Sequence, residues 1–342
     1  MKKFEGYEKG VNLGGWFSQC DYTEERYQNF IRKEDFAVIK GWGLDHVRVP
    51  VDYNLLENED GSFRESGFLH LSDAVRWAGE NGLNLIIDLH KTAGFSFDPG
   101  EKEAGFFENE KYQTRFYRLW EEIAKRFGQN PERVAFELLN EVTEERFMPA
   151  WNRIASECIR RIRVFAPESF ILVGGYWHNS ARSVKAIDVP DDEHLVFNFH
   201  CYEPHIFTHQ GAYWMPPMDT SFRITVHSSF AGFIEAGEKM LLGNVAGLEQ
   251  YPSDTTLTEQ YFIDLFREAA EAAEKKGVPL YCGEYGVIDN ADPEDALFWF
   301  AKIHAAFEHY GIGRAAWSYR QMDFGLSDSR MEGVREELLR NL

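Results

Sequence analysis

Short apolar runs alternate with longer amphipathic segments along most of the chain. The segments 116–127 and 261–273 carry apolar residues at helical spacing and are followed by Gly128 and Gly277, a residue that commonly ends helices. We expect eight strands, which lie at residues 10–13, 45–49, 83–90, 134–141, 170–174, 195–200, 279–284 and 313–317. This alternation predicts an α/β fold, a (β/α)8 TIM barrel with parallel strands.

An open, doubly wound parallel sheet is the alternative fold for the same alternation. That fold usually carries a glycine-rich phosphate-binding turn after its first strand. The segment Asn12-Leu13-Gly14-Gly15-Trp16 does not match that motif. The chain also has no internal repeat, low-complexity segment or Pro-rich linker, so we expect a single domain over residues 1–342.

The connection after the sixth expected strand is much longer than the usual link of a few residues. Residues 203–257 contain no further strand pattern, so we expect a subdomain-sized insertion or a long ordered lid there. Its segment 207–214 is rich in aromatic residues and lies just past a strand end. This segment is expected either to form a wall of a cleft at the strand ends or to pack the insertion onto the barrel.

The amino-acid composition limits which classes of binding partner are expected. The chain has 342 residues, with 28 Phe, 15 Tyr and 9 Trp, which is ample material for a large core and for stacking surfaces. Its formal net charge is −20, and an acidic surface repels phosphate backbones and anionic lipid headgroups. We therefore expect no nucleic-acid partner and no membrane partner, whereas a neutral sugar would be unaffected by this charge.

Targeting signals and cysteine spacing bear on the location. The residues at the start of the chain include no apolar stretch long enough for a signal-peptide core, and no run reaches the length of a membrane span. The four cysteines, Cys20, Cys158, Cys201 and Cys282, have no CxxC spacing and are interpreted as free thiols rather than zinc ligands or nucleophiles. We expect a soluble, cytoplasmic monomer.

Polar or aromatic residues end most of the expected strands. They are Arg48, His90, Asn140, Glu141, His200, Tyr202, Glu284 and Trp317. Because the carboxyl ends of the strands of a parallel barrel meet at one face, these side chains should converge. Two facing carboxyl groups, here Glu141 and Glu284, are typical of glycoside hydrolysis, since one can stay protonated as general acid while the other is an ionised nucleophile or base.

Each of these residues alone has an ordinary structural explanation, because acids form ion pairs and His and Trp are often buried. Eight of them at successive strand ends favour a functional site. Four other acids, Glu101, Glu103, Glu108 and Glu137, are interpreted as solvated or helix-linked charges. Counting back from Asn140, strand alternation is expected to turn Glu137 away from the face that Glu141 shares.

The constellation resembles the family 5 glycoside hydrolases, the large cellulase family of retaining (β/α)8 enzymes, over nearly the whole chain. The matching motifs are Asn12-Leu13-Gly14-Gly15-Trp16, His46-Val47-Arg48-Val49-Pro50, Asp88-Leu89-His90, Phe136-Glu137-Leu138-Leu139-Asn140-Glu141, Asn198-Phe199-His200-Cys201-Tyr202, Tyr281-Cys282-Gly283-Glu284-Tyr285-Gly286 and Ala316-Trp317. The insertion with Phe207-Thr208-His209-Gln210 is similar to that of the endoglucanase C type. The resemblance implies one catalytic domain that needs no cofactor or metal.

The resemblance implies a role for each acid. Glu141 would be the acid/base, whose pKa its surroundings must raise so that it can donate a proton. Glu284 would be the nucleophile, held ionised by Arg48 and Tyr202, and the two carboxyl groups should lie about 5 to 5.5 Å apart. His200 would lie near Glu141.

The remaining positions would contact the sugar. Asn140 would bind the sugar 2-hydroxyl, His90 a neighbouring hydroxyl, and Trp317 would stack beneath the ring. Lys91 departs from the family pattern, because many relatives carry a second His there, and this changes which hydroxyls are contacted at that edge.

The implied activity is endo-acting hydrolysis of β-1,4-glucan, with mixed-linkage β-glucan and glucomannan as further substrates. A β-mannanase or an exo-acting β-glucosidase is the alternative within the family. A metal-dependent barrel hydrolase that uses His90, Glu141, His200 and Glu284 as ligands, or a non-catalytic carbohydrate-binding barrel, represents a different class.

Overall fold

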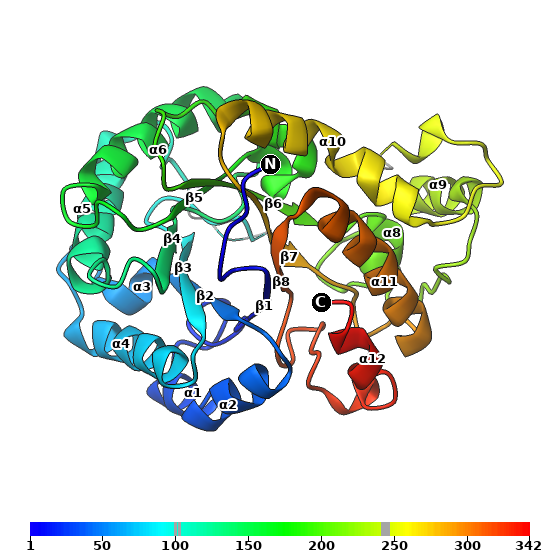
Figure 1. Ribbon diagram of the computed structural model, residues 1–342, viewed down its shortest axis with the longest axis horizontal. Helices are drawn as coiled ribbons and strands as arrows, with labels where there is room; N and C mark the ends of the chain where they lie inside the picture. The colour runs from blue at the N-terminus through cyan, green and yellow to red at the C-terminus, as the bar shows by residue number, and fades with distance from the viewer. Residues whose placement is uncertain (99–100, 102–103, 241–246) are drawn as a thin grey trace.

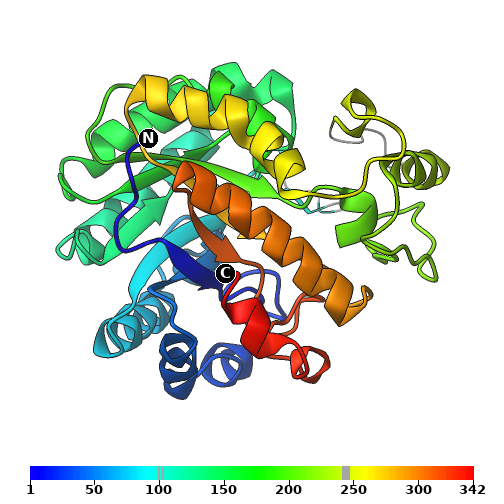
Figure 2. The same cartoon turned by 45° about the vertical axis from the view of Figure 1, so that its right-hand side comes forward.

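A computed structural model describes the chain except for residues 99–100, 102–103 and 241–246. Eight parallel strands form a closed barrel in the order in which they occur along the chain, with helices packed around the outside (Figures 1 and 2). The expected TIM barrel is confirmed. In the part of the chain that is described, no helix is both long and apolar enough to cross a membrane.

The strands lie close to the expected positions. They are β1 (Lys9–Asn12), β2 (His46–Asp52), β3 (Asn84–Lys91), β4 (Val134–Glu137), β5 (Ile171–Gly174), β6 (Leu195–Cys201), β7 (Leu280–Tyr285) and β8 (Gly313–Ala316). The expected fourth strand is too long. Residues 138–141 follow β4 as irregular backbone, and Glu141 has a left-handed conformation with φ 42°. Glu141 therefore leaves the strand direction and turns over the barrel mouth.

Helices fill the connections between the strands. The α-helices are α1 (Glu24–Asn29), α2 (Lys33–Gly41), α3 (Tyr53–Leu56), α4 (Glu65–Glu80), α5 (Glu110–Phe127), α6 (Met148–Ile162), α7 (Tyr176–Asn179), α8 (His205–Thr208), α9 (Phe230–Lys239), α10 (Glu259–Lys276), α11 (Pro293–Tyr310) and α12 (Arg335–Leu339). Short 3-10 helices are η1 (Glu145–Phe147), η2 (Ala181–Ala186), η3 (Leu248–Gln250) and η4 (Ser329–Met331). The two helices expected from the sequence correspond to α5 and α10.

Helix α5 shows how the sequence sets these boundaries. The side chain of Asn109 accepts a hydrogen bond from the backbone N–H of Lys111, which caps the N-terminus. An acid in the first turn and two basic residues in the last turn complement the helix dipole, and Gly128 is the C-cap. Its buried face packs on the barrel through apolar residues such as Phe116 and Trp120.

Strand alternation divides the barrel interior into layers. The layer nearest the amino ends of the strands is apolar and contains Phe4, Tyr7, Ile86, Ala135, Leu172, Val196, Tyr281 and Ala315. Two residues further along β3 and β6 the inward side chains become polar, as Asp88 follows Ile86 and Asn198 follows Val196. The polar layer lies directly beneath the carboxyl ends of the strands and supports the side chains at the barrel mouth.

Glu137 belongs to this polar layer, so the expectation that it is solvated and turned away is wrong. It is fully buried and accepts two hydrogen bonds from Arg48. The inward residue Ala135 lies two positions before Glu137 on β4, and alternation brings Glu137 inward as well. The sequence argument failed because it counted from Asn140: Glu137 and Glu141 are four positions apart, which strict alternation places on the same face, and residues 138–141 lie beyond the regular strand.

The connection between β6 and β7 contains α8, α9, η3 and α10. Helix α10 packs against the barrel beside η2 and α11, whereas α9 lies at the periphery on the right of Figure 1. In the expected insertion, residues 203–257, the described part carries the short helices α8, α9 and η3 and no strand longer than an isolated bridge. Helix α8 follows β6 directly and brings this segment to the barrel mouth.

Candidate active site

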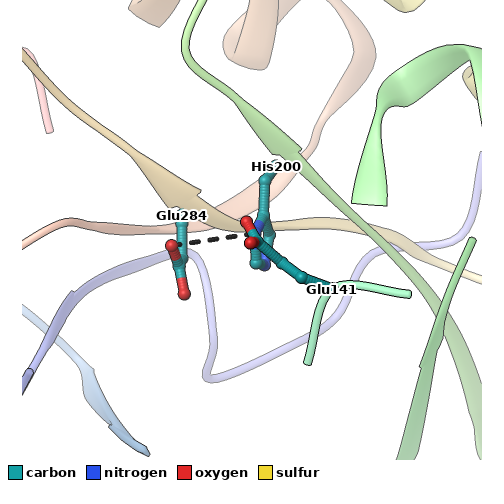
Figure 3. A group of neighbouring side chains, drawn as sticks. All are labelled: Glu141, His200 and Glu284. Atoms are coloured by element: carbon teal, nitrogen blue, oxygen red, sulfur yellow. Dashed lines mark hydrogen bonds and ion pairs between the residues drawn. The ribbon is translucent and has the colours of Figure 1, made fainter. Parts of the chain in front are cut away.

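A pocket of about 640 Å³ opens at the carboxyl ends of the strands. It is lined by Gln19, His90, Phe97, Asp98, Glu141, Trp177, His178, Ser180, His200, Tyr202, Glu203, His205, His209, Tyr213, Trp214, Met215, Glu284, Trp317, Met322, Asp323 and Phe324. Figure 3 shows Glu284, His200 and Glu141 facing one another, from β7, from β6 and from the segment after β4. The expected convergence of strand-end residues therefore takes place, and Arg48 and Asn140 lie just beneath it.

Glu284 is held by two hydrogen-bond donors. Arg48 Nη1 donates to Glu284 Oε1 over 2.7 Å, and the Tyr202 hydroxyl donates to Glu284 Oε2 over 2.9 Å. These are the two contacts expected from the sequence. The two donors fix the orientation of the carboxyl group from both of its oxygens, which suits a group that must attack from one position.

Arg48 organises the floor of the site. Its guanidinium is fully buried and also donates to Glu137, to Asn140 Oδ1 over 2.9 Å and to Asn12 Oδ1 over 2.9 Å, and it lies 3.0 Å from Asp88 Oδ2. Burial alone would lower the pKa of Arg48, but the surrounding carboxylates raise it well above its ordinary value. A permanent cation thus sits among the acids below the pocket.

Glu141 lies between two imidazoles. His200 Nδ1 is 2.8 Å from Glu141 Oε1, and His178 Nδ1 is 3.0 Å from Glu141 Oε2. Burial raises the pKa of Glu141, but the hydrogen bonds from the two histidines outweigh it, so the pKa lies well below the ordinary value. The expectation that the surroundings raise this pKa is therefore wrong.

The two carboxyl groups approach closely. One oxygen of Glu141, one oxygen of Glu284 and a ring nitrogen of His200 all lie within 4.8 Å of one another. Retaining glycosidases place their carboxyl groups about 5 to 5.5 Å apart and inverting ones about 6.5 to 9.5 Å apart. An approach of two carboxylate oxygens within 4.8 Å is closer to the retaining spacing than to the inverting one.

These three side chains also have the spacing of a metal site, which the metal-dependent alternative requires. Arg48 occupies Glu284 Oε1, and His200 Nδ1 is directed at Glu141, whereas His200 Nε2 has no hydrogen-bond partner among the described residues. A cation at Arg48 opposes a second cation beside Glu284. The arrangement fits an acid pair tuned by hydrogen bonds better than a ligand set.

Three buried side-chain atoms of the expected site residues have no hydrogen-bond partner among the described residues, namely His90 Nε2, Asn140 Nδ2 and His200 Nε2. The other ring nitrogen of His90, Nδ1, is 2.5 Å from Asp88 Oδ2. Burial lowers the pKa of His90 to about 4, so its imidazole is neutral at neutral pH. The Trp317 ring lines the pocket and lies parallel to His90, with ring centroids 5.8 Å apart.

Lys91 points into an ion-pair cluster rather than the pocket. Its amine lies 2.5 Å from Asp98 Oδ2 and 2.8 Å from Glu101 Oε1. Glu101 is exposed as expected but is not simply solvated, because it pairs with Lys91. Glu108 is exposed, and Glu103 lies outside the described residues.

The aromatic segment of the insertion serves both expected purposes. Phe207 is fully buried in the core, whereas Tyr213 is 71% exposed at the pocket. Trp214 lines the pocket and also packs beside Trp317 and Phe324. The insertion is therefore anchored through its first residues and contributes a pocket wall through the later ones.

His178 was not anticipated from the sequence. It lies in α7, four residues after the end of β5, where Trp177, His178 and Asn179 all have positive φ between 49° and 55°. The only available signal was a His and a Trp just past an expected strand end. Because a loop residue has no fixed periodicity, nothing in the sequence directed its ring toward Glu141.

Comparison with known proteins agrees with this geometry. The family model "Cellulase (glycosyl hydrolase family 5)" matches residues 5–323. Cellodextrinase A of Ruminococcus flavefaciens is 49% identical over 314 residues, which cover 92% of this chain and 86% of the relative. Endoglucanase C of Acetivibrio thermocellus is 34% identical over 337 residues, covering 97% of each chain.

The chain belongs to glycosyl hydrolase family 5, the cellulase family.

Solved structures share the fold of this family 5 hydrolase. A hyperthermophilic endo-β-1,4-glucanase in complex with substrate has a TM-score of 0.76 at 23% identity, covering 98% of this chain and 97% of the other. A structure described as an endoglucanase reaches a TM-score of 0.78 at 23% identity with the same coverage. At this identity the likeness establishes the barrel, and family membership establishes a glycoside hydrolase.

Proposed function

We propose that this family 5 hydrolase cleaves β-1,4-glucosidic bonds in β-glucans, including soluble cello-oligosaccharides, with retention of configuration. The single observation that carries the mechanism is the close approach of Glu141 and Glu284 with different partners. Glu284 has two fixed donors that favour an anion, whereas Glu141 contacts imidazoles that can exchange a proton with it. The substrate class rests on the cellodextrinase and endoglucanase relatives.

In the first step Glu284 attacks the anomeric carbon while Glu141 donates its proton to the departing glycosidic oxygen. The bond from the anomeric carbon to that oxygen breaks, and a covalent glycosyl ester forms on Glu284. Arg48 and Tyr202 each hold one oxygen of the attacking carboxylate, so less orientation must be gained in the transition state.

In the second step Glu141, now a carboxylate, accepts a proton from a water that attacks the same carbon. The ester bond to Glu284 breaks, and both acids return to their starting protonation. Two inversions at one carbon give net retention.

The free buried donors position the sugar. Asn140 Nδ2 is proposed to bind the 2-hydroxyl, His90 Nε2 a neighbouring hydroxyl, and Trp317 to stack on the ring. Asn140 Oδ1 is fixed by Arg48, so its amide orientation is set by the same cation that aligns Glu284. The positions of sugar and nucleophile are therefore coupled.

Azide rescue tests the assignment. Glu141→Ala and Glu284→Ala should both be nearly inactive. On a substrate with a good leaving group, azide should restore turnover to Glu141→Ala with a retained glycosyl azide, and to Glu284→Ala with an inverted one. Full activity in either variant, or the opposite pairing of product configuration, would refute the roles.

A substrate panel tests the specificity, with carboxymethylcellulose, lichenan, glucomannan, mannan, xylan and short cello-oligosaccharides resolved by product size. Monosaccharide as the sole product would replace endo action with exo-acting β-glucosidase activity. Activity confined to mannan would establish the β-mannanase alternative, and loss of activity on chelation would revive a metal-dependent mechanism. Binding of oligosaccharide without any cleavage would establish a non-catalytic protein.

We also propose a monomer that works in the cytoplasm without a cofactor. The four cysteines are free, which is compatible with a reducing compartment. Cell fractionation and the mass measured by light scattering test these two statements.

A further inference from the structure

His178 contacts Glu141, but it is not one of the two proposed catalytic acids and not one of the proposed sugar-binding residues. Its Nδ1 lies 3.0 Å from Glu141 Oε2, whereas His200 approaches the other oxygen, Oε1. His200 is buried, but the His178 side chain is 53% exposed and lines the pocket. Glu141 is thus held by one fixed imidazole and one that remains accessible to solvent.

The backbone holds His178 in place through a local arrangement. Three successive residues, 177–179, adopt left-handed conformations that L-residues rarely populate. The His178 N–H donates to the carbonyl of Val142, the residue after Glu141, over 3.1 Å. The turn after β5 is therefore tied by backbone and side chain to the segment that carries the acid/base.

We propose that His178 is a positioning residue that shares a proton with Glu141 and thereby controls when the acid/base is able to donate. The inference rests on the proposed role of Glu141. A proton on His178 Nδ1 moves to Glu141 Oε2, and Glu141 then donates one proton to the glycosidic oxygen. In the second step Glu141 takes a proton from water, and this proton can return to His178. The number of protons on the two residues is then the same before and after one turnover.

The charges around His178 favour this sharing. Burial lowers the pKa of His178, but the hydrogen bond to Glu141 and the charges of Glu141, Glu284 and Asp98 together raise it above its ordinary value. The pKa of His200 is raised as well, against burial, by Glu284 and Glu141. The two imidazoles and the carboxyl group therefore titrate as one cluster, and the last proton of this cluster is distributed over all three groups.

The affinity of such a cluster for its last proton is the sum of the binding constants of the individual groups. Removing the imidazole of His178 therefore lowers this affinity. The side chain of Asn places an amide donor near the position of Nδ1 and tolerates positive φ, so His178→Asn removes the titration while keeping the contact. His178→Gly tolerates the backbone but removes the contact as well. The two variants separate proton sharing from geometry.

On the alkaline side of the pH profile, the decline of kcat/KM should begin at a lower pH in His178→Asn than in the natural protein. The shift should be about 0.3 pH unit when the two imidazoles share the proton equally, and larger when His178 holds the larger share. His178→Gly should show the same shift together with a lower kcat, because Glu141 Oε2 loses its donor. His227→Asn, at an exposed histidine that does not line the pocket, should leave the profile in place.

An NMR titration of the histidine side chains provides a readout that does not require activity. The His178 pKa should lie above the ordinary value and should return toward it in Glu141→Gln. Unchanged profiles in both His178 variants, or a His178 titration that Glu141→Gln does not move, would overturn the proposal. Substantial activity in Glu141→Ala would instead remove the proposed function itself, so the two failures are distinguishable.

Discussion

Replacing Glu137 by Gln tests whether the charged layer under the site is necessary. Glu137 and Arg48 are both fully buried, with Arg48 Nε 2.7 Å from Oε2 and Arg48 Nη2 2.8 Å from Oε1. Asn198 donates to Oε1 as well, over 2.8 Å. Gln has nearly the same shape, but its amide nitrogen is a donor and would face an Arg48 N–H in either orientation, and the Asn198 amide as well at the Oε1 position.

The expected loss is about 3 kcal/mol in the free energy of unfolding. Removing one partner of a buried ion pair costs about 3 to 5 kcal/mol, and the lower end applies because Asp88 and Glu284 still neutralise Arg48. Burial raises the pKa of Glu137 above its ordinary value. The raised pKa means that the folded protein holds the Glu137 proton more tightly than the unfolded chain does, so the natural protein gains stability as the pH falls from this raised pKa toward the ordinary value. Glu137→Gln has no such titration, and the difference between the two proteins should therefore widen over that pH range.

Urea unfolding at neutral and at acidic pH measures the loss. The matched control is Glu157→Gln, because Glu157 also accepts two hydrogen bonds from an arginine, Arg160, but at the surface, where its removal should cost far less. The activity of Glu137→Gln should fall about tenfold or more, since Arg48 also aligns Glu284. Natural stability in Glu137→Gln at neutral pH would refute the view that the buried acid is needed to balance Arg48.

Three further changes probe the site, the insertion and the barrel. Tyr202→Phe removes the hydroxyl donor to Glu284 Oε2 and should lower kcat about 10- to 100-fold in steady-state assays, the value of one hydrogen bond to a charged group. Burial lowers the pKa of His209 to about 3, so the folded protein prefers the neutral ring. That preference stabilises the fold at pH values above the ordinary pKa of histidine. The stabilisation is lost as the pH falls toward 3, by up to about 1.4 kcal/mol per pH unit. His209→Phe should therefore flatten the curve of unfolding free energy against pH between about pH 6 and 4. Gly67→Ala would place its Cβ 1.8 Å from the backbone oxygen of Leu55 and should cost about 3 kcal/mol in urea unfolding.

Matched controls accompany these changes. Tyr213→Phe alters an exposed pocket tyrosine and should leave kcat nearly constant. His227→Phe changes an exposed histidine and should leave the slope of stability against pH as it is. Gly41→Ala adds a Cβ that meets nothing within 4 Å. A Tyr202 variant as active as its control, a His209 curve as steep as the natural one, or a tolerated Gly67→Ala would each contradict the corresponding reasoning.

The barrel and most of the site were accessible from the sequence. Buried parallel strands are short apolar runs, and the chain must leave each one at the same face, so residues such as His90 and Glu284 could be placed at the mouth by position alone. The contacts of Arg48 and Tyr202 with Glu284 were anticipated through the family resemblance. The residue roles stay predictions until the azide experiment is done.

The sequence by itself determined the alternation of eight strands with helices and the residues at the strand ends, because periodicity and strand polarity are local properties. Only the tertiary structure decided the protonation of the site. The low pKa of Glu141 comes from His178 and His200, which lie 37 and 59 residues further along the chain. Electrostatic coupling depends on distance in space, and neither a left-handed turn after β5 nor the bend of Glu141 beyond β4 is encoded in a periodic pattern.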